Sequence, residues 1–488
     1  MVKRKKAEMD LSDGILRLRC PKPLAINPSL DSSELISRLL APMSLESFLS
    51  SCWAEKPLLV QGPLQRLAPI ISHMKQLDLQ EMLEETPSEQ VHAWLRSSTT
   101  GSKDEPSGSA LQSVALDAAA ALMLAQTRQA ALYFRAPEAL EDLLVPGICN
   151  GLGAAFAGLY PGDSRPRGEI ETFVAQSGHV TGWHTDFQHN FTFQLRGSKR
   201  WRFKKGPVKN NVRALTPHFQ TKANFEQQMK LHVISEPSRP EFKPPDHFFA
   251  DADVVDVTAG DILYHPAGIW HHVECTGEIE SISINVSVSC ATWADLVSDA
   301  IHQSLWSSAS LRAPIVGLTV DYAAAVRQVE ERLREAKKWI NSLTAEDLLS
   351  PAMLEMPRLP SRIHIGRSRL GHQLQVSQSS CFRFSQLCAL VELPEDLSDS
   401  EEELPQSSKR FVLHANFGNE DVSSWLRVLL VAPKNLLLAM SWLQTRQLSK
   451  RSTKKFKAKE VLTASKTSWS NVCRLLRVLQ YCGLVLQC

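Results

Sequence analysis

The chain has 488 residues, of which 43% are hydrophobic and 22% are charged, and its formal net charge is +2. This length indicates several domains, and this composition is typical of a folded globular protein. The near-neutral charge gives no support to a polycation that binds nucleic acid over its whole surface. No apolar run reaches the ~20 residues that a membrane span needs.

Ten cysteines are scattered along the chain without a Cys-x-x-Cys pair. This spacing fits neither a zinc finger nor a disulfide scaffold, and it favours a reducing compartment. The basic run Lys3–Lys6 is not followed by an apolar segment, so it is no secretory signal. It is either a nuclear address or a solvated tail. We therefore expect a soluble, non-secreted protein of the nucleus, nucleolus or cytoplasm.

The N-terminal part is expected to be helical after a tail. Residues 1–31 carry several prolines and little periodicity, which predicts a basic flexible tail. Apolar residues at helical spacing predict a helix from Ser32 toward Trp53, and Leu58–Val60 reads as a strand after Pro57. Residues 97–109 are polar and predict a loop or disordered insert. Further helices are expected at Leu77–Glu84, Ala115–Thr127 and Glu138–Leu143.

From Glu169 the apolar period changes to two, which is typical of strands with one polar face. Ser281–Val288 alternates serine or asparagine with isoleucine or valine. Several such strands predict an α+β fold around a double-stranded β-helix, also called a jelly roll or cupin, with a wet cavity inside. An ordinary sandwich with a solvated outer face would show the same alternation. Residues 209–245, rich in proline, predict a long ordered loop that is often functional.

The C-terminal part returns to helices and shorter strands. The amphipathic segments Thr292–Ser307 and Asp321–Leu348 predict a helical pair that packs on the barrel or on a second subunit, and we favour dimerisation. The last third permits a winged-helix-like module, in which the basic run Lys450–Lys459 either contacts nucleic acid or forms a solvated face. Strands are expected at Cys381–Leu393 and Arg410–His414, and helices at Val422–Leu430, Lys434–Trp442 and Ser470–Tyr481. The expected domains are 32–290 catalytic, 291–365 helical and 366–488 winged-helix-like.

Three residues of the strand region form a candidate metal site. His184 and Asp186 are two positions apart, so on an extended strand they point to the same face. His271 follows the turn Pro266–Gly268 and can complete a face of two imidazoles and one carboxylate. Such a face leaves coordination positions open and suits Fe(II) with a chelating cosubstrate and dioxygen, although these ligands also suit other divalent metals. His272 would point away if His271 points inward.

Four more residues are candidates for binding a cosubstrate. Lys199 follows a predicted turn, and a buried ammonium there would pair with a cosubstrate carboxylate. A surface lysine is the alternative, in which case Arg200 could take that role. Thr181 and Asn190 offer a hydroxyl and an amide to the same cavity, and Asn285 lies on the polar face of the last strand.

The pattern His184-Thr-Asp186, Lys199 and Leu263–Pro266 through Trp270-His271 resembles the JmjC-type 2-oxoglutarate oxygenases. Leu40–Gln61 and Thr292–Leu296 are similar to segments of the ribosomal oxygenases within that family. The resemblance implies Fe(II) held by His184, Asp186 and His271, and 2-oxoglutarate whose distal carboxylate is held by Lys199 and Thr181. It also implies hydroxylation of a ribosomal-protein side chain, histidine in eukaryotes and arginine in some bacteria, and a dimer formed through the helices after the barrel.

Three residues depart from the family pattern: Thr185, Phe187 and His265. They border the expected substrate pocket and therefore leave the substrate open. A histone methyl-lysine demethylase and an RNA-nucleoside hydroxylase are alternative enzymes, and a catalytically silent cupin that only binds partners is the alternative outside enzymology.

Overall fold

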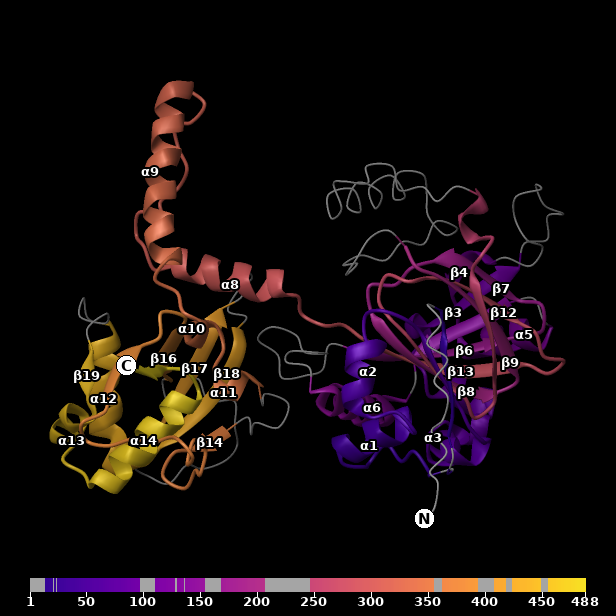
Figure 1. Cartoon of the computed structure of the whole chain (residues 1–488), viewed down its shortest axis with the longest axis horizontal. Helices are drawn as coiled ribbons and strands as arrows, with labels where there is room; N and C mark the ends of the chain where they lie inside the picture. The colour runs from indigo at the N-terminus through magenta and orange to yellow at the C-terminus, as the bar shows by residue number, and fades with distance from the viewer. Residues whose placement is uncertain are drawn as a thin grey trace, which may run out of the picture. The chain divides into compact units, whose positions relative to one another are not determined.

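The computed structural model describes twelve stretches of the chain. They are 14–20, 22, 24–96, 110–127, 130–135, 137–153, 168–206, 246–354, 362–393, 408–417, 424–448 and 455–488. The predictions for 97–109 and 209–245, and for the first half of the basic run from Lys450, lie outside these residues. The described chain divides into two compact units, with the boundary between Cys290 and Ala291 (Figure 1). Each unit is described by itself below.

Two sheets form the first unit. The larger has nine strands in the order β1-β2-β11-β8-β13-β6-β5-β3-β4, and the smaller has four in the order β10-β9-β12-β7. All the pairings are antiparallel except that of β1 with β2. The strands are β1 Leu16–Arg19, β2 Leu58–Gln61, β3 Val91–Arg96, β4 Ala110–Ala115, β5 Ala130–Arg135, β6 Gly168–Ala175, β7 Val180–His184, β8 His189–Arg196, β9 Ser198–Lys204, β10 Asp253–Thr258, β11 Ile262–His265, β12 Trp270–Cys275 and β13 Ser281–Val288. The expected α+β class with a jelly-roll core and flanking helices is confirmed.

Strand β13 shows how the larger sheet separates its two faces. Ile282, Ile284, Val286 and Val288 join the main apolar core, while the alternate residues Ser283 and Asn285 line a cavity. Helix α6 (Glu138–Leu152) packs against β6 and β13 on the apolar face, and α1 (Ser32–Leu40) packs on α6. The other helices of this unit are α2 Leu45–Ser51, α3 Ala68–His73, α4 Leu79–Glu84 and α5 Ala118–Gln126. Period-two alternation thus gives β13 a helix-covered side and a cavity side.

Side-chain caps explain where several of these helices begin. Asp31 accepts a hydrogen bond from Ser33 N at the start of α1, and Ser44 accepts one from Ser47 N at the start of α2. Asp78 and Asp117 cap α4 and α5 in the same way. Each cap satisfies an amide that has no partner within its helix.

The expected flexible tail at residues 1–31 contains an ordered strand. Strand β1 pairs in parallel with β2, with Leu16 opposite Leu58. Leu16 and Leu18 contact the main core, whereas Arg17 on the opposite side donates a hydrogen bond to Val254 O at 2.6 Å. The segment has only four residues, so its alternation was too short to outweigh the surrounding prolines.

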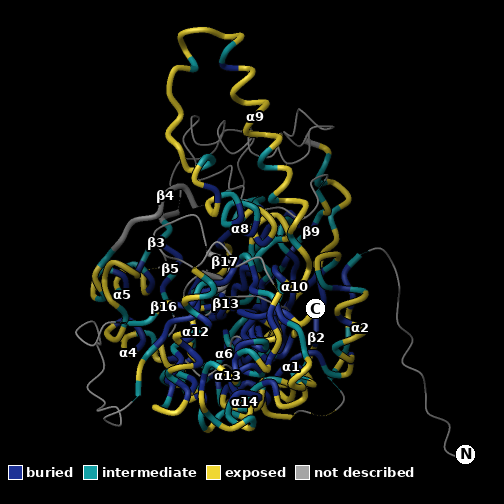
Figure 2. Tube along the Cα trace, turned by 90° about the vertical axis from the view of Figure 1, so that its left-hand side faces the viewer, coloured by how far each residue is buried: buried dark blue, intermediate teal, exposed yellow. Residues whose placement is uncertain are grey.

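The second unit contains two long helices, α8 (Trp293–Trp306) and α9 (Tyr322–Ile340), followed by two small sheets. Helix α9 is exposed along most of its length (Figure 2). The sheets have the orders β14-β18-β17-β16 and β19-β15-β20. The remaining elements are α10 Ala345–Leu348, α11 Pro351–Leu354, β14 Arg362–His364, β15 Cys381–Phe384, β16 Cys388–Glu392, β17 Lys409–Phe417, β18 Ser424–Ala432, α12 Leu437–Leu448, β19 Phe456–Lys457, α13 Ala458–Ser465, α14 Trp469–Tyr481 and β20 Val485–Gln487.

The end of the chain, where a winged-helix-like module is predicted, alternates helices with short strands. Helix α12 is followed by the short strand β19, the helices α13 and α14, and the strand β20, while β15 completes the sheet. The expected helix at Val422–Leu430 was wrong, because β18 lies there and pairs with both β17 and β14. Leu426, Val428 and Leu430 are buried on alternate positions. In the described part of the chain, no helix has the length and apolar character that crossing a membrane requires.

A glycine at the turn between β10 and β11 tests the packing of that turn against the backbone that follows β2. Gly260 has φ +101°, and a Cβ there would lie 2.4 Å from Gly62 O. We expect Gly260→Ala to lower the free energy of unfolding by at least about 3 kcal/mol, because backbone strain adds to a backbone clash. Gly153→Ala is the control, since its φ is +63° but nothing lies within 4 Å of the added Cβ; it should cost about 1 kcal/mol. Chemical denaturation measures both, and equal costs would contradict the packing.

Candidate functional site

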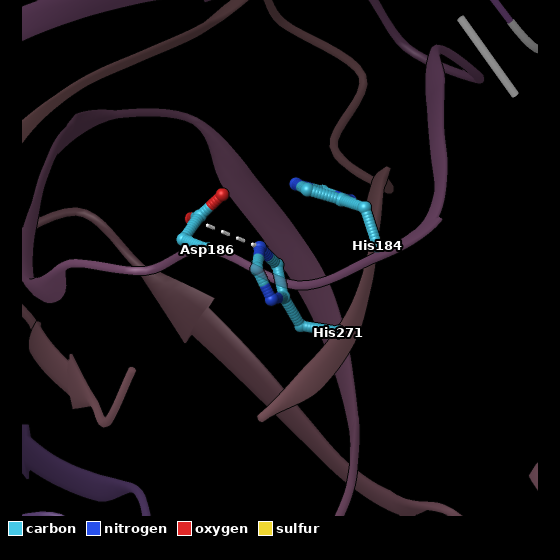
Figure 3. A group of neighbouring side chains, drawn as sticks. All are labelled: His184, Asp186 and His271. Atoms are coloured by element: carbon cyan, nitrogen blue, oxygen red, sulfur yellow. Dashed lines mark ion pairs between the residues drawn. The ribbon is translucent and has the colours of Figure 1, made fainter. Parts of the chain in front are cut away.

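The candidate metal ligands come from two paired strands of the smaller sheet. His184 is the last residue of β7, and its Cα partner across the antiparallel ladder is His271 of β12. Asp186 follows β7 by two residues. One potential ligand atom from each of the three lies within 4.8 Å of the other two (Figure 3). In the described residues this is the one group of three or more histidine, cysteine or acidic side chains arranged to hold a metal.

Backbone carbonyls set the tautomers of both histidines. His184 Nδ1 lies 2.8 Å from Gly182 O, and His271 Nδ1 lies 3.1 Å from Ile269 O. A carbonyl oxygen only accepts, so each Nδ1 carries the proton and donates. A metal would then be bound through Nε2, which is the arrangement of metal-binding histidines. His271 Nε2 lies 3.6 Å from Asp186 Oδ2.

Asp186 is fixed through both its backbone and its side chain. Its carbonyl accepts a hydrogen bond from Gly268 N at 2.7 Å, which joins it to the turn that leads into β12. Its Oδ2 accepts from Asn190 Nδ2 at 3.1 Å. Gly268 adopts φ +77°, a conformation that favours glycine. The turn and Asn190 therefore orient the carboxylate toward the two histidines.

A buried amide network continues behind Asn190. Asn285 Nδ2 donates to Asn190 Oδ1 at 2.9 Å, and Ser287 Oγ donates to the same oxygen at 2.6 Å. Thr192 Oγ1 donates to Asn285 Oδ1 at 2.9 Å. These bonds fix which end of each amide is the donor, so Asn190 presents its NH₂ to Asp186. The network acts as a support for the metal-ligand carboxylate.

Lys199 is the second charged feature of the site. Its side chain is buried, Nζ donates to Ser283 Oγ at 2.7 Å, and Nζ lies 5.4 Å from the ring centroid of Phe173. Desolvation lowers the pKa of Lys199. Over the described residues no carboxylate forms an ion pair with it. By contrast, Arg200 is exposed and pairs with Asp256 on the outside of the barrel. Of the two candidate residues, Lys199 is therefore the buried one.

These residues surround a cavity of about 450 Å³. His184, Asp186 and His271 line it together with Lys199, Thr181 and Asn285. Asn190 does not line the cavity, and it contacts Asp186 from behind instead. The structure therefore brings six of the seven predicted residues to one space and gives Asn190 a supporting position.

The two other histidines of the second motif take different positions. His265 lines the cavity, is buried, and its ring centroid lies 4.6 Å from that of His271. Burial moves its pKa well below the ordinary value, so the ring is neutral. His272 instead accepts a hydrogen bond from Arg202 Nη1 at 3.3 Å and is not a member of the triad.

Sequence reasoning missed one wall of the cavity. His92 and Trp94 of β3, Tyr133 of β5, and Glu171 and Phe173 of β6 line it. Tyr133 donates to Glu171 Oε1 at 2.5 Å. The signal was available in part, because Glu171 and Phe173 share one face of an alternating strand. Nothing in the sequence indicated that β3 and β5 extend the same sheet.

The comparisons with known proteins agree with this architecture. Residues 55–293 match the family model for a cupin-like domain. The "JmjC domain-containing protein D" of Dictyostelium discoideum is 28% identical over 165 residues, 33% of this chain and 33% of that protein. The "Bifunctional lysine-specific demethylase and histidyl-hydroxylase NO66" of the same organism is 31% identical over 123 residues, 25% of this chain and 20% of that protein. The resemblance to JmjC-type oxygenases is confirmed.

Another relative and a solved structure cover more of the chain at lower identity. "Uncharacterized protein YxbC" of Bacillus subtilis is 22% identical over 288 residues, 58% of this chain and 78% of that protein. The structure of YcfD, a ribosomal oxygenase from Escherichia coli, is 13% identical and covers 91% of this chain and 98% of its own, with a TM-score of 0.34. A further YcfD structure is described as a complex with cobalt and 2-oxoglutarate.

Removal of the amide that supports Asp186 tests the assignment of a metal site. We expect Asn190→Ala to weaken binding of Mn(II) by about 10- to 100-fold, because the carboxylate loses the partner that orients it. Calorimetric titration of the metal-free protein measures the affinity. Asn471→Ala, in the second unit, is the matched control and should bind like the wild type. Equal affinities for the two variants would remove Asn190 from the site.

Proposed function

We propose that the protein is an Fe(II)- and 2-oxoglutarate-dependent dioxygenase that hydroxylates a protein side chain. One observation carries the proposal: a face of two histidines and one carboxylate shares a cavity with a buried lysine that has no carboxylate partner among the described residues. The first feature suits a divalent metal with open coordination positions. The second suits an anionic cosubstrate, since a buried ammonium is costly unless it is paired.

The residues present fit the two groups that this chemistry requires. His184, His271 and Asp186 would hold Fe(II), with the histidine tautomers already set by Gly182 O and Ile269 O. Lys199 would hold the distal carboxylate of 2-oxoglutarate. When bound, these groups couple the conversion of 2-oxoglutarate to succinate and CO₂ with the hydroxylation of a substrate C–H bond by dioxygen.

The protein's own contribution is positioning and exclusion of water. Asn190 and the Gly268 amide hold Asp186 in place, so little reorganisation is needed when a metal binds. Ser283 keeps Lys199 Nζ directed within the cavity, and Thr181 lines the same space and offers a hydroxyl to the cosubstrate. Desolvation strengthens the attraction between the ammonium and a bound carboxylate.

For the substrate, we propose a ribosomal or other translation-related protein. The support is the relative named as a histidyl-hydroxylase, together with the segments similar to ribosomal oxygenases. The same relative is also named as a lysine-specific demethylase, which keeps demethylation as the second candidate. Hydroxylation of an N-methyl group releases formaldehyde, so formaldehyde separates the two.

Turnover with a mixed substrate pool tests the oxygenase. The pool is total ribosomal protein, incubated with Fe(II), 2-oxoglutarate and air, and the readouts are succinate and protein mass. We expect a one-oxygen mass gain on a protein of the pool. Asp186→Ala and Lys199→Met should each reduce it by at least about 100-fold, because they remove a metal ligand and the anion partner.

Two variants of the same residue types serve as controls. Asp256→Ala and Lys205→Met alter charged residues on the outside of the barrel, where each forms an exposed ion pair. They should react like the wild type. Succinate without a mass gain would keep the oxygenase and reject this substrate pool. No succinate from a folded protein that also binds no metal would reject the oxygenase.

We also propose that α9 mediates a homodimer. Val326, Val329, Leu333 and Ile340 are exposed at spacings that place them on one side of the helix. Leu333→Lys should shift the protein from dimer to monomer in light scattering, because an ammonium would be buried in an apolar contact. Glu331→Lys adds the same side chain on the opposite side and should leave the dimer intact. A wild-type monomer at micromolar concentration would reject the proposal.

A further inference from the structure

The cavity contains a second ionisable group without an ion-pair partner among the described residues, the carboxyl group of Glu171. This residue lies on β6, opposite Asn285 of β13 and Arg135 of β5 in the sheet register. It lines the cavity, and its strand lies between β5 and β13 in the larger sheet. Its one hydrogen bond among the described residues comes from the hydroxyl of Tyr133.

The neighbouring carboxylates of Glu169 and Glu141 share the guanidinium of Arg135, whereas Glu171 forms no ion pair in the described structure. Arg135 Nη1 lies 2.5 Å from Glu169 Oε2 and 3.9 Å from Glu141 Oε2. Glu141 Oε2 also accepts from Ile170 N at 3.1 Å. Within the described stretches, no lysine, arginine or histidine forms an ion pair with Glu171. Loss of bulk water, with the nearby Glu169, raises the pKa of Glu171 to about 8.

This carboxylate has no evident structural purpose. A carboxyl group away from bulk water is unfavourable unless a cation or several donors compensate it, and the single Tyr133 hydroxyl compensates it only in part. A neutral glutamine would accept the same hydrogen bond without that cost. Uncompensated ionisable groups that line a cavity are candidates for ligand binding.

The walls around Glu171 are aromatic. Tyr133 and Phe173 have ring centroids 5.4 Å apart, and Trp94 lies 6.2 Å from Tyr133 and 6.4 Å from Phe173. His92 lies 5.7 Å from Tyr133. Aromatic faces attract guanidinium and ammonium groups, and they also pack on the methylene groups that carry them.

The cavity thus offers partners for one anion and one cation. In the proposed function, on which this inference rests, Lys199 takes the anion. We propose that Glu171, with Tyr133 and the aromatic wall, selects a substrate side chain that carries a positive charge, a guanidinium or an ammonium, over a neutral side chain of the same shape. Glu171 is then a specificity-determining residue, and arginine or lysine is the substrate class.

Peptide pools that differ only in charge test the inference. Each pool has random flanks around one central residue: arginine, its neutral isostere citrulline, lysine or Nε-acetyl-lysine. Binding is measured without dioxygen to full-length protein saturated with Mn(II) and 2-oxoglutarate. We expect the arginine or the lysine pool to bind at least about tenfold more tightly than its neutral counterpart, because charge-assisted hydrogen bonds to a desolvated carboxylate are lost in the neutral pool.

Substitution of Glu171 should remove this preference. Glu171→Gln keeps an acceptor for Tyr133 and removes the ionisable carboxyl group, so the variant should fold, and its preference for the charged pool should fall to about twofold or less. Glu171→Asp should restore part of it. Glu280→Gln is the control, since Glu280 pairs with Arg196 and does not line the cavity; it should keep the full preference.

The outcomes separate this inference from the proposed function. Wild-type protein that binds Mn(II) and 2-oxoglutarate but does not distinguish charged from neutral pools overturns the inference alone. A preference that survives in Glu171→Gln also overturns it. Failure of the wild type to bind Mn(II) and 2-oxoglutarate overturns the proposed function and the inference with it. Whichever of the arginine and lysine pools binds more tightly identifies guanidinium or ammonium as the preferred group.

Discussion

The site depends on the pairing of β7 with β12. This antiparallel ladder sets His184 directly opposite His271, although the two residues are 87 positions apart in the sequence. The hydrogen bond from Gly268 N to Asp186 O then attaches the third ligand to the turn before β12. Backbone pairing rather than side-chain contact therefore brings the three ligands together. A shift of this register by one residue would turn His271 to the other face of the sheet.

The larger sheet supplies the complementary half of the site. Its apolar face packs on α6, which α1 covers in turn, and the opposite face carries polar residues such as Asn285 and Ser283. Buried polar residues are tolerated there because they bond to one another and to the charged groups they support. Lys199 and Glu171 are the exceptions, since neither has an ion-pair partner in the described structure. A bound anion would pair with Lys199, and a bound cation would favour the ionised form of Glu171.

Much of the site could be predicted from the sequence, because its signals are local. The spacing of His184 and Asp186 fixes a shared face, and the alternation in Ser281–Val288 predicts a polar wall. The role of Glu171 could not be predicted, since it depends on which strands become neighbours. The orientation of the Asn190 amide could not be predicted either, because it is fixed by Asn285 of β13, which is distant in the sequence. Asn190 contacts Asp186 across the turn between them. Glu171 of β6 accepts a hydrogen bond from Tyr133 of the neighbouring strand β5, and long-range sheet order places β5 there.

The wrong predictions of secondary structure also arise from contacts between segments that are distant in the sequence. Strand β1 is four residues long, and its order comes from pairing with β2 rather than from local preference. Strand β18 is rich in leucine and valine, and a short apolar run fits a helix or a strand until its neighbours are known. In both cases tertiary pairing decided the structure.

The central claim is that one cavity binds Fe(II) and 2-oxoglutarate together. The most direct measurement is anaerobic visible spectroscopy of the protein titrated with Fe(II) in the presence of 2-oxoglutarate. A chelated complex absorbs visible light by charge transfer from the metal to the ligand. The account predicts this absorption in the wild type, its loss in His271→Ala, and a higher 2-oxoglutarate requirement in Lys199→Met. Folded wild-type protein that develops no such absorption at saturating concentrations would contradict it.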